Sequence, residues 1–204
     1  MKLFVLPQNG VIAPFPGPGA VFGHVQSGNP FLRPPELVEH GRTVLFSGRL
    51  EDDGAGWTNW GPRVWEWFGA CCDQLGDKAA GTKVTICFRP RAADVLCDPS
   101  ACVAFLDSRR GEPFELLLDA SAFLTAQMVG DAQDHLIRAY EMLAHRERVV
   151  GVILANVAGG KLVPLHKGEL DVQLLITIWA SHCPADLPVL ILDEEPEAQA
   201  RLFE

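Results

Sequence analysis

Charged residues stand directly after two apolar runs that have the composition of buried strands. Asp119 follows the run at 114–118, and Arg89 follows the run at 83–88. Because α/β proteins place their sites at the carboxyl ends of strands, both side chains are candidates for chemistry. Asp119 could act as an acid or as a metal ligand, and Arg89 could bind a phosphate or a carboxylate. Alternatively, the two side chains form an ion pair, or Asp119 caps backbone N–H groups of the following turn.

A second group of polar residues lies in the segment PLHKGELD, residues 164–171. His166 could serve as a general base, because its ordinary pKa suits neutral pH. The structural alternative makes Gly168 a turn residue and makes Glu169 and Asp171 acids of a first helical turn, where the helix dipole favours negative charge. The sequence favours the structural alternative.

Short runs of β-branched and aliphatic residues predict five buried strands, at 43–47, 83–88, 114–118, 148–154 and 188–192. Apolar residues recur at helical spacing between them, over 62–76, 99–107, 131–145 and 169–181. Strand followed by helix, repeated along the chain, predicts a parallel sheet covered by helices.

Two architectures fit this pattern, a closed β/α barrel and an open doubly wound sheet. No GxGxxG or GxxxxGK[ST] follows a strand, which argues against nucleotide-binding forms of the open sheet. We therefore expect an α/β fold of the β/α (TIM-type) barrel class, abbreviated or incomplete at its N-terminal side, in a single domain over 1–204. The barrel-like core is expected over 42–193. Residues 7–35, rich in proline and glycine, are expected to form an irregular arm.

Three segments, KVTICFRPRAADVLCDPSACVAFLD, LLLDASAFL and VVGVILANVAGGKLVPLHKGELD, occur in an order typical of one family. From about Thr43 to Asp193 the chain resembles the sugar phosphate isomerases and epimerases, the xylose-isomerase-like TIM barrels that include metal-dependent AP endonucleases. The resemblance implies a metal site at the strand ends, formed by Glu, Asp and His.

Most of the ligands that this resemblance implies are replaced. The family's Glu falls on Arg89, its His after Asp119 on Ala122, its paired His residues on Gly151 and Ile153, and its following Asp on Asn156. Asp119, Gly168 and Asp171 are retained, whereas the terminal Glu has no assigned counterpart near Asp193 and Glu194. One carboxylate cannot hold a divalent ion, and an Arg in a ligand's place repels it. We therefore expect no metal and no cofactor, with a divalent metal as the alternative.

The leading interpretation is a non-catalytic xylose-isomerase-like barrel that acts as a binding or scaffolding subunit. The alternative is a metal-dependent sugar (phosphate) isomerase or epimerase, or a related lyase, with an atypical site. A third possibility is a metal-free binder of small anions centred on Arg89. The candidate catalytic residues are Asp119 and His166, and the candidate ligand-binding residues are Arg89, Asn156, Asp171 and Asp193.

The amino-acid composition limits the kinds of partner that this protein is expected to bind. The formal charge of −9 and the pI near 5.1 argue against binding to nucleic acid, because such binding depends on Lys and Arg. No run approaches the ~18 apolar residues of a membrane span, so we expect a cytoplasmic protein that does not bind membranes. A protein partner or a homo-oligomer is expected, with a small sugar or sugar phosphate as a possible ligand.

Four of the five tryptophans lie close together, at positions 57, 60, 65 and 67. Trp67, at helical spacing with Val64 and Leu75, is predicted to lie in the core, whereas Trp57 and Trp60 are expected to line a pocket or an interface. Arg91 is expected to be a solvated loop charge. The six cysteines show no CxxC pair and predict free thiols in the core.

Overall fold

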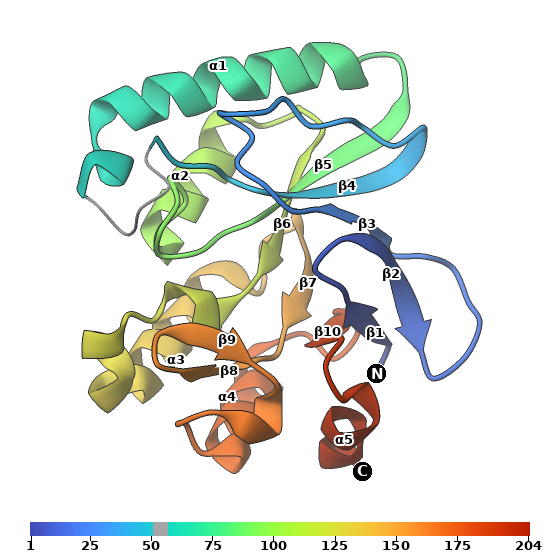
Figure 1. The fold of residues 1–204 in the computed structure, drawn as a ribbon, viewed down its shortest axis with the longest axis vertical. Helices are drawn as coiled ribbons and strands as arrows, with labels where there is room; N and C mark the ends of the chain where they lie inside the picture. Colours follow the sequence, from blue (N-terminus) through green and yellow to red (C-terminus); the bar gives the residue numbers. More distant parts are fainter. Residues whose placement is uncertain (51–56) are drawn as a thin grey trace.

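The computed structural model describes residues 1–50 and 57–204 and places their strands in a closed barrel (Figure 1). Around the barrel the order is β1 (Leu3–Leu6), β10 (Val189–Leu192), β7 (Val149–Ile153), β6 (Phe114–Leu118), β5 (Lys83–Arg89), β4 (His40–Phe46), β3 (Gly23–Gln26) and β2 (Gly10–Phe15). Strand β2 runs antiparallel to β1 and β3, and the other neighbours are parallel. The expected β/α barrel is confirmed.

Helices follow five of the strands. These are α1 (Pro62–Ala79) after β4, α2 (Pro99–Ser108) after β5, α3 (Ala132–Leu143) after β6, α4 (Val172–His182) after β7 and α5 (Pro196–Ala200) after β10. A small hairpin, β8 (Asn156–Ala158) and β9 (Lys161–Val163), lies between β7 and α4. Short 3-10 helices are η1 (Trp57–Trp60), η2 (Ala120–Phe123), η3 (Ala126–Asp131), η4 (Leu165–Lys167) and η5 (Arg201–Phe203). No helix in the described part of the chain is long and apolar enough to cross a membrane.

The prediction of an irregular arm over 7–35 was wrong, because β2 and β3 lie within it and complete the barrel. Residues 10–12 of β2 pair with β3, and residues 13–15 pair with β1. Pro14 therefore has a neighbouring strand on one side only, where a proline is tolerated in a sheet. The barrel core begins at Leu3 instead of residue 42, and the shortening falls on the helices, which are missing between β1 and β4.

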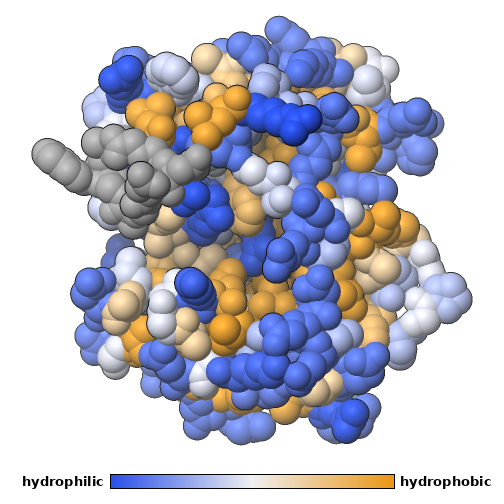
Figure 2. Space-filling view, in the orientation of Figure 1, coloured by the Kyte–Doolittle hydropathy of each residue, from blue (hydrophilic) through white to orange (hydrophobic). Residues whose placement is uncertain are grey.

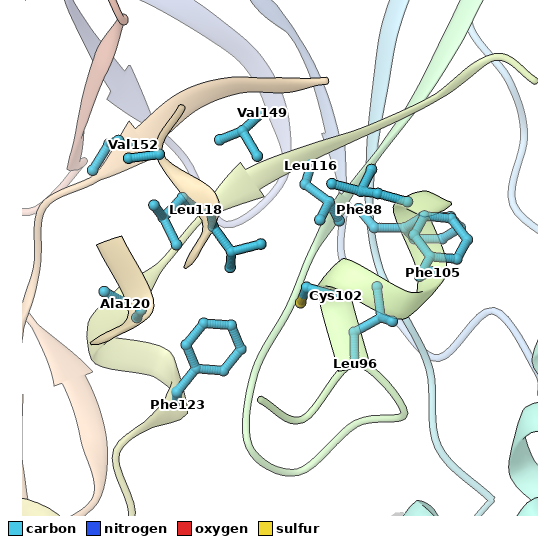
Figure 3. Packing of buried hydrophobic residues seen from close by; sticks show 14 of the residues in the cluster. Phe88, Leu96, Cys102, Phe105, Leu116, Leu118, Ala120, Phe123, Val149 and Val152 are labelled. Carbon is cyan, nitrogen blue, oxygen red and sulfur yellow. The ribbon is translucent and has the colours of Figure 1, made fainter. Parts of the chain in front are cut away.

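Alternation along the strands creates two apolar cores. Inside the barrel, Ile12, Val44, Cys87, Leu117 and Leu190 pack together with Phe22 from the loop before β3. Outside it, the opposite faces of the same strands pack against the helices. Figure 3 shows Phe88 and Leu116 of the barrel facing Leu96, Cys102 and Phe105. The rings of Phe88 and Phe105 meet edge to face, with centroids 5.5 Å apart.

Helix α1 buries a narrower face than the sequence predicted. Val64 and Leu75 are buried as expected, and Phe68 is buried with them, but Trp67 is 49% exposed, so its placement in the core was wrong. The buried stripe repeats at steps of four and three residues from Val64, and Trp67 lies at its edge.

Candidate functional site

The mouth of the barrel carries a buried ion pair between Arg89 and Asp119. Cys87 points into the barrel, so Arg89, two residues further along β5, lies on the same face. Asp119 has the same relation to Leu117 of β6. Arg89 Nε donates to Asp119 Oδ2 at 2.9 Å, and Arg89 Nη2 lies 2.8 Å from the same oxygen. The ion pair, one of the arrangements that the sequence allowed, is therefore present.

Asp119 is also the cap of the next turn. Its Oδ1 accepts a hydrogen bond from the backbone N–H of Ala122 at 3.2 Å, at the start of η2. The Asp119 side chain is fully buried, and that burial raises the pKa of its carboxyl, while the charge of Arg89 acts in the opposite direction. Both carboxylate oxygens are thus engaged within the protein.

A cavity of about 490 Å³ opens beside this pair. Arg89, Arg91 and Phe46 line it from the ends of β4 and β5, and Ser121 and Ala122 line it from η2. The β8–β9 hairpin closes the other side with Val157, Gly160, Lys161 and Leu162. Figure 2 shows the molecular surface hollowed between the half that carries α1 and the half that carries β8 and β9, with hydrophobic side chains in the hollow.

Arg91 is an ordered part of this site, so its interpretation as a solvated loop charge was wrong. Its Nε donates to Asp94 Oδ2 at 2.7 Å, and its guanidinium carbon lies 3.8 Å from the centroid of the Phe46 ring. Asp94 is buried, which raises the pKa of its carboxyl against the opposing charge of Arg91. The spacing of Arg91 and Asp94, three residues apart, was the signal in the sequence for this pair.

Asn156 is committed to the hairpin. Its side-chain amide donates to the carbonyl oxygens of Leu165 at 3.0 Å and Leu170 at 2.9 Å, and its Oδ1 accepts from the backbone N–H of Leu170 at 3.1 Å. Gly168 is packed against the Asn156 side chain, and a Cβ on Gly168 would overlap it. Asn156 therefore fixes the loop between β9 and α4.

The other candidate residues lie around the loops after β9 and β10. His166 Nε2 is 3.0 Å from Glu195 Oε2, and Lys167 Nζ donates to both Glu194 and Glu195 at 2.7 Å. These bonds raise the pKa of Lys167 and lower that of Glu195. His166 Nδ1 is buried and has no hydrogen-bond partner among the residues that the structure describes.

Asp171 is the N-cap of α4. Its Oδ1 accepts from the backbone N–H of Gln173 at 2.7 Å, so Asp171 precedes the first turn of α4, which begins at Val172. Glu169 accepts instead from the backbone N–H of Gly159 at 2.6 Å, so the prediction of two acids in the first helical turn was wrong. Asp193 is exposed after β10. The structure thus joins Arg89 with Asp119, whereas Asn156, His166 and Asp171 each bond to other groups.

No protein-family model matches the chain, and no curated protein matches its sequence. Among solved structures, the chain is similar to the crystal structure of a xylose isomerase domain protein from Planctomyces limnophilus, with a TM-score of 0.49 and 13% identity. The similarity covers 78% of this chain and 54% of that chain, so this chain spans about half the length of the Planctomyces limnophilus protein.

The positions at which the sequence resemblance implies paired histidines lie in closely packed apolar surroundings. A Cβ on Gly151 would lie 3.0 Å from Leu190 Cδ1, 3.1 Å from Leu117 Cδ2 and 3.3 Å from Phe22 Cζ. Ile153 is buried in the apolar core inside the barrel. Within the described part of the chain, no three His, Cys, Asp or Glu side chains form a group that could hold a metal ion.

Proposed function

We propose that this chain is a non-catalytic barrel that binds a ligand or partner and has the Arg89–Asp119 ion pair where related barrels hold a metal. The observation that carries the proposal is the occupation of both Asp119 oxygens, by Arg89 and by the Ala122 N–H. A divalent ion needs several free oxygen or nitrogen donors that converge on it. Two nitrogens of Arg89 already occupy Asp119 Oδ2, which leaves Oδ1 as the one oxygen that Asp119 could offer. The charge of Arg89 would repel an ion placed there.

Packing inside the barrel supports the same proposal. The histidine positions implied by the resemblance are Gly151 and Ile153, and the space around Gly151 is filled by Phe22, Leu117 and Leu190. Introducing imidazole ligands there would require the core to expand, which costs stability. In this proposal, apolar side chains around Gly151 and the Arg89–Asp119 ion pair take the place of metal ligands at two separate positions in the barrel.

The alternative function is a metal-dependent sugar or sugar phosphate isomerase with an atypical site. Its ligands would come from Asp119, His166, Asp171, Asp193 and Glu194. His166 and Glu194 belong to the group with Lys167 and Glu195, and Asp171 caps α4. Recruiting them would cost the contacts that hold these loops.

Exposed apolar side chains support the binding of another protein or of a second copy of this chain. Leu32 is 64% exposed, and Trp67 lines a groove with Pro30 and Pro34. Aromatic side chains of this kind commonly anchor interfaces. Trp60 is also exposed, although its Nε1 donates to the Ala92 carbonyl, and the side chain of Trp57 lies outside the described residues.

Metal analysis tests the proposal. The purified protein is dialysed against Mn²⁺, Zn²⁺ and Mg²⁺ in turn, and bound metal is measured alongside turnover of sugars and sugar phosphates. We expect less than stoichiometric metal and no turnover. One tightly bound equivalent that is lost in D119N, or in H166A as the test of the alternative, together with turnover, would overturn the proposal. D107N, on the surface of α2, is the control.

A further inference from the structure

We propose that the cavity between Phe46, Arg91 and Lys161 binds a small organic anion, with one carboxylate or phosphate group on an apolar body. The inference deepens the proposed function and rests on it, because it requires a site without a metal. Three cationic side chains, Arg89, Arg91 and Lys161, line the cavity. None of the described residues that line it carries a carboxylate.

Donors remain available on these cations. Within the described residues, Arg91 uses only its Nε in a hydrogen bond, to Asp94, so its two terminal nitrogens are left as a fork. Arg89 engages Asp119 through Nε and Nη2, which leaves Nη1. Lys161 forms no ion pair with any described residue. A guanidinium fork and an ammonium group match the oxygens of a carboxylate or a phosphate.

The charges also favour an anion. Asp119 balances Arg89 and Asp94 balances Arg91, whereas Lys161 has no balancing acid among the described residues. The two aspartates hold the guanidinium groups in place from behind the cavity wall, so the arginines are positioned before a ligand arrives. Preorganised donors reduce the entropic cost of binding.

The remaining wall of the cavity is apolar, so it favours a ligand whose body, apart from the anionic group, is apolar. Phe46, Leu124, Val157 and Leu162 line it together with several alanines. The volume, about 490 Å³, suits a small molecule. The ring of Phe46 lies under Arg91, which leaves a flat cationic and aromatic surface beside the fork. An inorganic anion alone would leave this apolar area unfilled, so the body of the ligand contributes to binding.

Calorimetric titration with benzoate and phenyl phosphate tests the inference, with benzamide as the neutral probe and inorganic phosphate as the head group alone. Each titration is run in chelator and again with Mn²⁺. At least one of the two anionic aromatic probes is expected to bind, more tightly than benzamide and inorganic phosphate, in both buffers. K161Q should weaken this binding by about tenfold, since a charge-assisted hydrogen bond is lost.

A second variant guards against effects on folding. R91K keeps the charge beside the buried Asp94 but removes the fork, and it should also weaken binding. R110Q changes an exposed arginine that pairs with Asp107, and it should bind like the wild type. Absence of binding in both buffers, equal binding of benzamide, or wild-type affinity in both K161Q and R91K would overturn the inference alone. Binding that requires Mn²⁺ would overturn the proposed function as well.

Discussion

Arg89 and Asp119 form a buried ion pair at the mouth of the barrel, 30 residues apart in the chain, with Arg89 Nη2 2.8 Å from Asp119 Oδ2. The Arg89 side chain is 11% exposed and the Asp119 side chain is fully buried. Neighbouring parallel strands β5 and β6 bring them together. We propose that this pair lies where related barrels would hold a metal.

Removing one member of the pair should be costly. D119A leaves Arg89 without its counter-charge, and loss of one partner of a buried pair typically costs about 3–5 kcal/mol. The variant R89M/D119L should recover much of this loss, because well-packed apolar residues replace buried pairs at little cost. Unfolding in denaturant measures both values.

The control for this prediction is D107N, which weakens surface pairs with Arg110 and Arg146 and should change stability little. If D119A unfolds at the same denaturant concentration as the wild type, the pair has no structural role.

Gly168 should be intolerant of a side chain. G168A places a methyl group on Asn156, whose amide holds Leu165 and Leu170, so the loop before α4 must shift. We expect a loss of about 1–3 kcal/mol, the usual cost of overpacking. Thermal unfolding of the purified variant gives the value.

A glycine with room around it gives the opposite expectation. Gly76 lies inside α1, where a Cβ would make an ordinary contact of 3.9 Å with Phe114, so G76A should stabilise the protein by about 0.5–1 kcal/mol.

For the Gly168 prediction, a G168A variant as stable as the wild type would show that the Asn156 side chain does not pack against Gly168.

The thiols should make the protein less stable in alkali. Burial raises the pKa of Cys97 to about 11 and that of Cys183 to about 12, from an ordinary 9.0. Between pH 9 and the raised pKa of each thiol, the folded protein keeps a proton that the unfolded chain releases. The free energy of unfolding therefore falls as pH rises above 9. Unfolding measured at a series of pH values tests this decline.

C97S and C183S should each make the alkaline decline shallower. The native thiols should also react slowly with iodoacetamide at pH 8, because little thiolate is present. Rapid labelling of Cys97 and Cys183 in the folded protein would contradict this expectation.

The sequence predicted much of the C-terminal part of the fold, since its buried strands are continuous apolar runs and its helices have a clear period. Strand 114–118 was predicted with the bounds that β6 has. Strand β2 was not predicted, because Pro14 suggested a loop. Whether a strand can contain this proline depends on which neighbouring strand lies beside it. The closed barrel determines that neighbour, and the sequence of the segment alone does not.

The candidate site shows the same division. The Arg89–Asp119 pair followed from two charged residues placed after neighbouring strands. The structural role of Asn156 depends on carbonyl groups 9 and 14 residues away, and no local pattern announces them. Arg91 was assigned to solvent, because the Phe46 ring beneath it comes from another strand.

The side-chain N–H of Arg89 offers the most direct test of the central claim. In a ¹⁵N NMR spectrum of the full chain, a signal that D119N removes or strongly shifts identifies Arg89 Nε–H. We expect this signal to exchange slowly with water and to stay sharp when Mn²⁺ is added in slight excess. Selective broadening of the Arg89 signal by one equivalent of Mn²⁺, with the pair disrupted, would contradict the proposed metal-free site.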